Sequence, residues 1–286
     1  MADAQLLTSP VAYEEVVPGV LSRVGEEEIR VRFELADVAV LDVDECLVAG
    51  FTQVNLARET ARLLACTALL HPGRLGPLFR LVRAGVLLSW LRGAPIPAPM
   101  KNARMQELFT DACRGVPRTV MERALGSAWR GLRPGAALCV RYLAERVPTG
   151  IVSLGLDIVL DRFPGVVRKE TGKEVLLHFA AANRVLWERD RFAGLARPIR
   201  SGAPDKLSLF EGAVSGMHVA APLVIGHGAD EERLCELADS MGGLSVGMAP
   251  AEADRRLFHV VVPDGGWDTL LRFMLSCRKE DTGSVN

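Results

Sequence analysis

The chain has 286 residues, of which 49% are hydrophobic, and a formal net charge of −1 at pH 7. This length supplies one full hydrophobic core and a second, smaller unit. The near-neutral charge and the aromatic content of 6% argue against nucleic acid as the main partner, because proteins that bind it carry basic surfaces and aromatic stacking platforms.

The most apolar stretch of the chain is residues 63–91. Proline, glycine and arginine interrupt it, so its charge-free runs are far shorter than the ~20 residues that a membrane-spanning helix needs, and we predict no transmembrane segment. Arg80 and Arg83 among leucines and valines favour an amphipathic helix. We expect its apolar face to pack on its own domain, and contact with a membrane surface is the open alternative.

Six cysteines are scattered along the chain without a Cys-x-x-Cys pair, and the sequence shows no secretory signal. This pattern predicts free thiols in a reducing compartment, and therefore a cytoplasmic protein. We expect the six thiols to behave as small buried apolar groups without a catalytic role.

The first half of the chain predicts one buried strand followed by a helical region. After an acidic, irregular beginning, residues 28–35 alternate like a strand, and the Val-rich run 38–41 predicts a buried parallel strand. Apolar residues at three- and four-residue spacing predict helices over most of residues 52–130. Three prolines within residues 92–100 predict a loop inside this region.

The second half alternates helices and strands. We expect a helix over 136–147, then a short strand that ends at Ser153. The remaining predicted elements are one or two strands within 174–187, a hairpin arm over 191–199, a helix over 204–214, a strand, glycine-rich turn and helix over 219–242, strands within 243–248 and 257–263, and a helix over 266–275. This alternation predicts an α/β fold with a doubly wound parallel sheet, which binds ligands beyond the carboxyl ends of its strands.

Two carboxylates, Asp42 and Asp44, directly follow the first buried strand. Like charges so close together repel one another unless a cation or a proton offsets them. From these residues alone, a metal site, a nucleophile beside a proton donor and a polar loop cap all remain open. Other polar groups at predicted strand ends are Ser153 and the turn 226–231, and Lys206 precedes that turn.

These groups, in this order, resemble the four motifs of the haloacid dehalogenase-like (HAD) superfamily. The D-x-D of Asp42 and Asp44 matches the first motif, Ser153 the second and Lys206 the third. The turn 226–231 matches the glycine-rich fourth motif in part.

Residues 179–198 resemble a segment that precedes the lysine in the phosphoserine-phosphatase-like branch of that superfamily. The resemblance implies a HAD-like Rossmannoid core with an inserted helical cap of type 1. The expected division is an N-terminal extension over 1–35, the core over 36–50 and 131–275, the cap over 51–130 and a C-terminal tail over 276–286.

The resemblance implies a metal-dependent phosphatase that acts on a small phosphorylated substrate. Asp42 would attack phosphorus to form an aspartyl-phosphate, and Asp44 would protonate the leaving alcohol and then activate water. Lys206 would balance the charge, and Mg²⁺ would hold Asp42 and the phosphate. The residues expected to bind the substrate are Phe51, Ser153, Leu154 and Gly155.

The fourth motif departs from the family pattern, because His227 stands where that branch has a metal-binding Asp. Imidazole is a poor ligand for Mg²⁺, so Mn²⁺ or another divalent ion is an alternative. We expect Asp42, the backbone carbonyl of Asp44 and at least one of His227, Asp230 and Glu231 around the ion. A turn histidine that only contacts the carboxylates is equally open. The alternative function is a catalytically weakened relative that binds a phosphorylated ligand or a partner protein.

A second departure concerns the substrate. Phosphoserine phosphatases hold the substrate's amino group with an acidic residue seven positions after the second Asp, and this chain has Phe51 there. An aromatic ring does not pair with an ammonium as a carboxylate does. We therefore predict a substrate with an uncharged or hydrophobic body rather than phosphoserine.

Overall fold

The computed structural model describes residues 12–68, 72–93, 96 and 98–277. Within them, eight strands form one sheet in the order β1-β2-β10-β9-β8-β3-β4-β5, and β6 and β7 form a separate hairpin. Strands β10, β9, β8, β3, β4 and β5 run parallel, and β1 and β2 extend the edge in antiparallel pairing. The strands are β1 (Glu14–Val17), β2 (Val20–Ser22), β3 (Val38–Leu41), β4 (Thr149–Leu156), β5 (Phe179–Asn183), β6 (Val185–Glu188), β7 (Arg191–Leu195), β8 (Pro222–Gly226), β9 (Leu244–Met248) and β10 (Val260–Val262).

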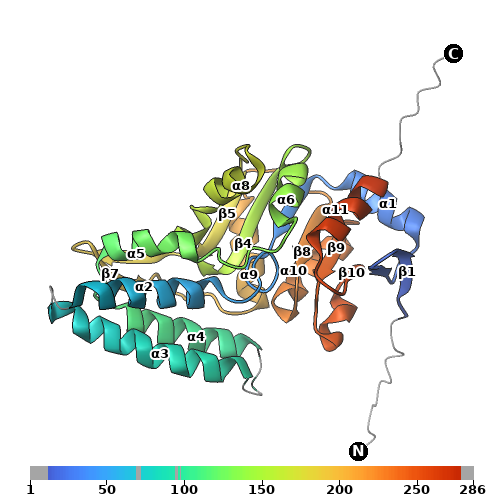
Figure 1. The fold of residues 1–286 in the computed structure, drawn as a ribbon. Helices are drawn as coiled ribbons and strands as arrows, with labels where there is room; N and C mark the ends of the chain where they lie inside the picture. The colour runs from blue at the N-terminus through green and yellow to red at the C-terminus, as the bar shows by residue number, and fades with distance from the viewer. Residues whose placement is uncertain (1–11, 69–71, 94–95, 97, 278–286) are drawn as a thin grey trace, which may run out of the picture.

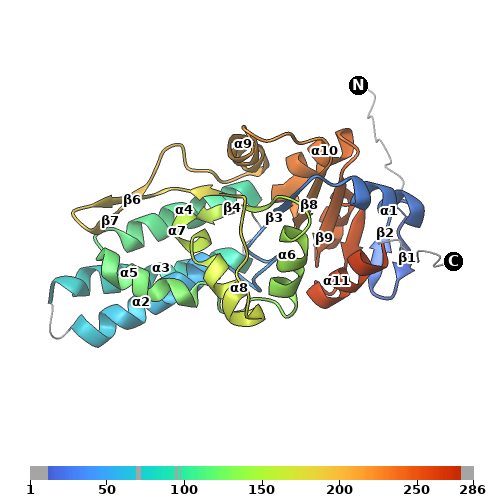
Figure 2. The same cartoon turned by 90° about the horizontal axis from the view of Figure 1, so that it is seen from above.

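Helices cover both faces of the sheet, as Figure 2 shows. Val38 and Val40 of β3 belong to the core cluster on the side of α9 and α10, whereas Ala39 and Leu41 belong to the cluster on the side of α6 and α11. A strand buried on both faces needs apolar residues at every position, which explains the unbroken run in β3. These helices are α1 (Glu26–Leu35), α6 (Ala136–Ala144), α7 (Asp157–Leu160), α8 (Phe163–Thr171), α9 (Ala203–Ala213), α10 (Glu232–Ser240) and α11 (Trp267–Ser276). The predicted doubly wound α/β fold is confirmed.

The strand order reverses at β3, which fixes where a ligand can bind. From β3 the chain adds β4 and β5 on one side of the sheet and later adds β8, β9 and β10 on the other. Leu41, the last residue of β3, is in register with Ile151 of β4 and Ile225 of β8. The crevice at such a switch point is the usual ligand site of an open α/β sheet.

A helical unit is inserted between β3 and β4 and lies at one end of the molecule (Figure 1). Its helices confirm the helical region predicted over 52–130, and the predicted loop at 92–100 falls partly outside the described residues. The hairpin β6–β7 reaches the same unit, where Phe192 packs edge-on against Phe109 at 6.0 Å between ring centroids. The unit contains α2 (Thr52–Ala68), α3 (Leu75–Gly93), α4 (Ala98–Cys113) and α5 (Arg118–Ala124), with the short 3-10 helices η1 (Pro72–Arg74) and η2 (Leu125–Ser127). Two further 3-10 helices, η3 (Ala229–Glu231) and η4 (Glu252–Leu257), follow strands β8 and β9 of the sheet.

Three local predictions were wrong. Residues 28–35 belong to helix α1, which begins with three glutamates and is supported by the i,i+4 ion pairs Glu26–Arg30 and Glu28–Arg32. Strand β4 does not end at Ser153 but continues to Leu156, with a register shift after Val152. All six cysteines lie in the described ranges and are free, but Cys66 is exposed rather than buried.

Candidate active site

The carboxyl ends of the central strands and the helical unit enclose a cavity of about 190 Å³. Asp42, the residue after β3, is 5% exposed, and its backbone N–H donates to the carbonyl of Ile225 at 2.9 Å. This bond fixes the start of the D-x-D loop to the neighbouring strand. The residues that line the cavity are Asp42, Asp44, Phe51, Gln53, Lys101, Asn102, Met105, Gln106, Ser153, Leu154, Lys206, His227 and Asp230.

Lys206 reaches the cavity from the first turn of α9 and is 1% exposed. Its Nζ donates to Asp42 Oδ1 at 2.5 Å and also to Glu231. Burial by itself lowers the pKa of this ammonium, but the two carboxylates outweigh it and raise the pKa well above the usual value for lysine. Lys206 is therefore a permanent cation beside Asp42.

The two aspartates of the loop have opposite protonation tendencies. Burial raises the pKa of Asp42, but the Lys206 ammonium and the hydrogen bond with His227 lower it to about 2. Thr52, at the start of α2, donates to Asp44 through its backbone N–H, which lies 2.7 Å from Oδ1, and through its side chain. Burial raises the pKa of Asp44 to about 6. One carboxylate is thus kept ionised, and the other can gain and lose a proton near neutral pH.

The bulged end of β4 forms the next wall of the cavity. The backbone N–H of Gly155 donates to Ser153 Oγ at 2.9 Å, and a Cβ at Gly155 would lie only 3.0 Å from that oxygen. The carbonyl of Leu154 accepts hydrogen bonds from the side-chain amides of Asn183, at 2.7 Å, and Gln106. Ser153 is therefore held at the cavity by its own strand, and the strand is tied to the helical unit.

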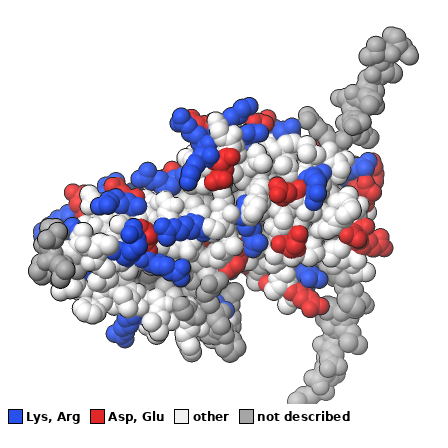
Figure 3. Space-filling model, in the orientation of Figure 1, with Lys and Arg blue, Asp and Glu red and all other residues white. Residues whose placement is uncertain are grey.

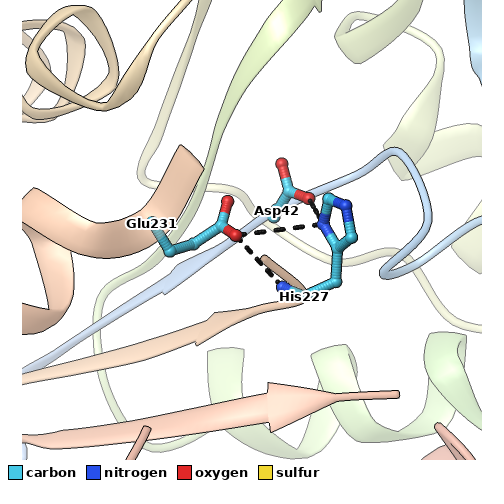
Figure 4. A group of neighbouring side chains, drawn as sticks. All are labelled: Asp42, His227 and Glu231. Carbon is cyan, nitrogen blue, oxygen red and sulfur yellow. Dashed lines mark hydrogen bonds and ion pairs between the residues drawn. The ribbon is translucent and has the colours of Figure 1, made fainter. Parts of the chain in front are cut away.

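The turn after β8 brings His227 to Asp42, as Figure 4 shows. His227 Nδ1 lies 3.0 Å from Asp42 Oδ2. Burial lowers the pKa of this imidazole, but the hydrogen bond with Asp42 and the charge of Glu231 raise it to about 9. Glu231 Oε2 caps the turn by accepting the backbone N–H groups of His227, at 3.1 Å, and Gly228, at 2.9 Å. Asp230 points to the helical unit instead, where Asn102 donates to its Oδ2 at 2.7 Å.

No protein-family model matches the sequence, and no curated protein matches it significantly. Solved structures share its fold. Cytosolic 5'-nucleotidase IIIB bound to cytidine matches with a TM-score of 0.59 at 14% identity, over 92% of this chain and 95% of that one. Phosphoserine phosphatase in its apo form matches with 0.55 at 15% identity, over 83% and 98%. A HAD family hydrolase from Salmonella enterica serovar Typhi matches with 0.51 at 20% identity, over 83% and 70%. The chain has a haloacid dehalogenase-like fold.

The HAD-like resemblance implies a divalent ion, and the residues at Asp42 fit one of borderline character. Asp42, His227 and Glu231 each offer a ligand atom, and these atoms lie within 4.8 Å of one another. One imidazole nitrogen with two carboxylate oxygens suits Mn²⁺ or Zn²⁺ better than Mg²⁺, which prefers oxygen ligands. His227 Nδ1 must be free of its proton to bind an ion, so the ion would replace the hydrogen bond between His227 and Asp42.

The helical unit contributes site residues that the sequence analysis missed. Gln53 of α2 donates to Gln106 of α4 at 2.8 Å, and both amides are almost fully buried at the cavity. Asn102 and Gln106 are four residues apart, so one face of α4 presents both. The sequence signal that could have identified Asn102 and Gln106 is their helical spacing beside an apolar helix face. The cavity that they line is seen only in the folded chain, where Gln106 donates to the Leu154 carbonyl of β4.

Proposed function

We propose that this protein is a phosphatase that hydrolyses a small phosphomonoester, with Asp42 as the nucleophile. The observation that carries the proposal is that Asp42, Asp44, Ser153 and Lys206, from three distant segments, line one cavity at the switch point of the sheet. The phosphoserine phosphatase and 5'-nucleotidase structures with the same fold support this class of reaction.

In the first step, a carboxylate oxygen of Asp42 attacks phosphorus while the bond from phosphorus to the ester oxygen breaks. The electron pair of that bond goes to the leaving oxygen, and Asp44 transfers its proton there, so the alcohol leaves neutral. The product on the protein is an aspartyl-phosphate. The low pKa of Asp42 keeps the nucleophile ionised, and the pKa of Asp44 near 6 lets it hold the proton.

In the second step, the ionised Asp44 takes a proton from water as the water oxygen attacks phosphorus. The bond between phosphorus and the Asp42 oxygen breaks, which releases inorganic phosphate and restores both carboxyl groups. Asp44 is the acid in one step and the base in the next, as microscopic reversibility requires.

Positive charge and hydrogen-bond donors are needed around the phosphoryl oxygens. Lys206 supplies a fixed cation, and Ser153 supplies a hydroxyl at the bulged end of β4. A divalent ion, held by Asp42 with His227 and Glu231, would add further charge neutralisation when bound.

The substrate proposal follows from the cavity wall on the side of the helical unit. Phe51, Met105 and Leu154 form its apolar part, and Phe51 stands where the resemblance places an ammonium-binding acid. We infer that an alkyl or aryl phosphate is preferred over phosphoserine.

The test is phosphate release from a panel of alkyl, aryl and amino-acid phosphomonoesters, with Mg²⁺, Mn²⁺, Co²⁺ or chelator, for the wild type and Asp42→Asn. Because the amide is nearly isosteric but not nucleophilic, we expect release by the wild type and background release by a folded Asp42→Asn variant. Equal release by both proteins would contradict the role of Asp42, and a preference for phosphoserine would contradict the substrate class.

The second candidate function is a catalytically weakened relative that binds a phosphorylated ligand. One observation favours it. Both carboxylate oxygens of Asp42 already contact basic groups, Lys206 and His227, so an ion would have to displace one of these contacts to bind Asp42. Calorimetry with inorganic phosphate separates the two candidates. Binding of phosphate without turnover of any ester, under every metal condition, would favour the second.

A further inference from the structure

Helix α3 of the helical unit exposes a row of large apolar side chains. Twelve large apolar residues are exposed in the described part of the chain, and five of them lie on α3. They are Leu75, Phe79, Val82, Val86 and Trp90, and Phe79, Val86 and Trp90 are each about 70% exposed. Scattered single residues of this kind need no explanation, but a contiguous patch marks an interaction surface.

These five residues form one face of α3. Their spacing of three or four residues places them on the same side of the helix, along about 22 Å of its length at 1.5 Å per residue. The opposite side, with Leu81, Ala84, Leu88 and Leu91, is buried in the helical unit. Packing on the unit itself therefore accounts for one apolar face of α3 and leaves the other without a partner in the described chain. We call the five residues the α3 stripe.

The surroundings of the α3 stripe are basic. Residues 60–106 contain seven lysine or arginine residues and no aspartate or glutamate, although the whole chain is slightly acidic. Arg83 is exposed and lies beside the stripe, one helical turn from both Phe79 and Val86. In Figure 3 the lower left of the molecule, over α3, is white with a few blue groups. Two acidic residues of α4 lie nearby: Asp111 lines a cavity together with Arg80 and Arg83, and Glu107 pairs with Arg104. Cations therefore outnumber anions by seven to two over residues 60–111. An apolar row with an excess of cations is complementary to an anionic surface that has an apolar interior.

The stripe continues into an apolar groove between α2 and α3, of about 480 Å³. Val82 and Val86 form its α3 wall, Val54 and Ala57 form its α2 wall, and Arg58 is a charged residue in that wall. A groove of this lining suits an acyl chain whose anionic headgroup meets the arginine.

We propose that α3 docks this protein on the surface of an anionic lipid bilayer. Phe79 and Trp90 enter the interface between headgroups and acyl chains, and Arg83 contacts lipid phosphates. None of the described helices is long and apolar enough to span a membrane. The docking does not depend on catalysis at Asp42.

The test is co-sedimentation of the full chain with vesicles of phosphatidylcholine alone or mixed with phosphatidylglycerol. We expect binding to the mixed vesicles, weakened by salt. Phe79→Ser with Val86→Ser should lower the partition coefficient at least about tenfold through lost apolar burial. Arg83→Gln should lower it about fivefold, which corresponds to the loss of one basic residue near an anionic surface.

Two matched variants control for nonspecific effects. Leu176→Ser removes an exposed leucine on the core, and Arg123→Gln removes an exposed arginine on α5; neither should change partitioning. A blue shift of tryptophan emission with mixed vesicles that is absent in Trp90→Phe would support insertion of the stripe. No binding to mixed vesicles, or equal binding by the stripe and control variants, would overturn the proposal. A wild-type dimer that Phe79→Ser with Val86→Ser converts to a monomer, without vesicle binding, would assign the stripe to self-association instead.

Discussion

At the scale of single residues, His227 is what most distinguishes this site. It stands beside Asp42, at 3.0 Å, where the family resemblance implies a metal-binding aspartate. Its pKa of about 9 makes it a cation at neutral pH, and Lys206 is a second cation on the other oxygen of Asp42. Two fixed positive charges next to one carboxylate oppose the binding of Mg²⁺ by simple Coulomb repulsion.

We therefore predict that His227→Asp makes the protein easier to saturate with Mg²⁺. The substitution replaces a cation by an anion with oxygen ligands, so the Mg²⁺ concentration for half-maximal phosphate release should fall by about 10–100-fold. His227→Asn, which removes the imidazole without adding charge, is the matched control. If His227→Asp leaves both the Mg²⁺ requirement and calorimetric Mg²⁺ affinity at the wild-type values, His227 is not at the metal.

At the scale of elements, Asn183 connects the strand that carries Ser153 to the segment that leads into α9. Its Nδ2 donates to the carbonyls of Leu154, at 2.7 Å, and Arg200, at 3.0 Å, and its Oδ1 accepts the backbone N–H of Arg200 at 2.7 Å. The side chain is 2% exposed, so water does not easily replace these bonds. Asn183 is therefore a positioning residue for β4 and for the helix that carries Lys206.

We predict that Asn183→Ala lowers both stability and activity. Unsatisfied buried backbone groups should reduce the free energy of unfolding by about 1–3 kcal/mol, measured by urea titration. Phosphate release should fall as well, with the loss mainly in kcat, because Lys206 and Ser153 lose their common anchor. Asn55→Ala is the matched control, since Asn55 also donates to two backbone carbonyls, those of Ala128 and Arg130, and none of these three residues lines the cavity. Equal kinetic effects of the two variants would contradict the positioning role.

At the scale of the whole molecule, His259 links strand β9 of the sheet to helix α10. Its Nδ1 accepts the backbone N–H of Ser245 at 3.1 Å, which leaves Nε2 as the donor to Asp239 at 2.9 Å. Burial, together with the charges of Arg23 and Arg32, lowers the pKa of His259. The serine, histidine and aspartate contact one another like a catalytic triad, but Ser245 is 0% exposed and no substrate reaches it.

The lowered pKa of His259 predicts a contribution to stability that is lost in mild acid. Below about pH 6.5 the unfolded chain takes up a proton at this histidine that the folded chain does not, so the contribution of His259 to the free energy of unfolding falls between about pH 7 and pH 5. The raised pKa values of Asp44 and Asp230 contribute with the opposite sign in the same window. The pKa of Asp239 is lowered from 3.8, so its own contribution to the free energy of unfolding is lost only at a lower pH than that of His259. His259→Gln should remove the positive contribution of this histidine to the slope of the free energy of unfolding against pH, measured by urea titration at each pH, with the exposed His218→Gln as the control. An unchanged slope in His259→Gln would contradict the prediction.

Local patterns in the sequence predicted most elements from β3 onward and the polar groups at the strand ends, but not β1, β2 or helix α1. The apolar run before Asp42 predicts a strand buried on both faces, and the alternation that follows predicts parallel pairing, so Asp42 and Ser153 were predicted at the ligand-binding edge of the sheet. The family resemblance placed Lys206 with them. The prediction was wrong for residues 28–35, where apolar and polar residues alternate as in a strand. These residues form helix α1, and the i,i+4 ion pairs Glu26–Arg30 and Glu28–Arg32 support it.

The partners of these groups became clear from the packing of the folded chain. Asn183 and Gln106 converge on one carbonyl from distant segments, and Glu231 was predicted as a metal ligand but also caps a turn and binds Lys206. The apolar residues of α3 divide into a packed face and an exposed face only when α2 and α4 cover one side. Such long-range contacts depend on how the helices and strands pack together, and the spacing of residues along the chain does not determine that packing.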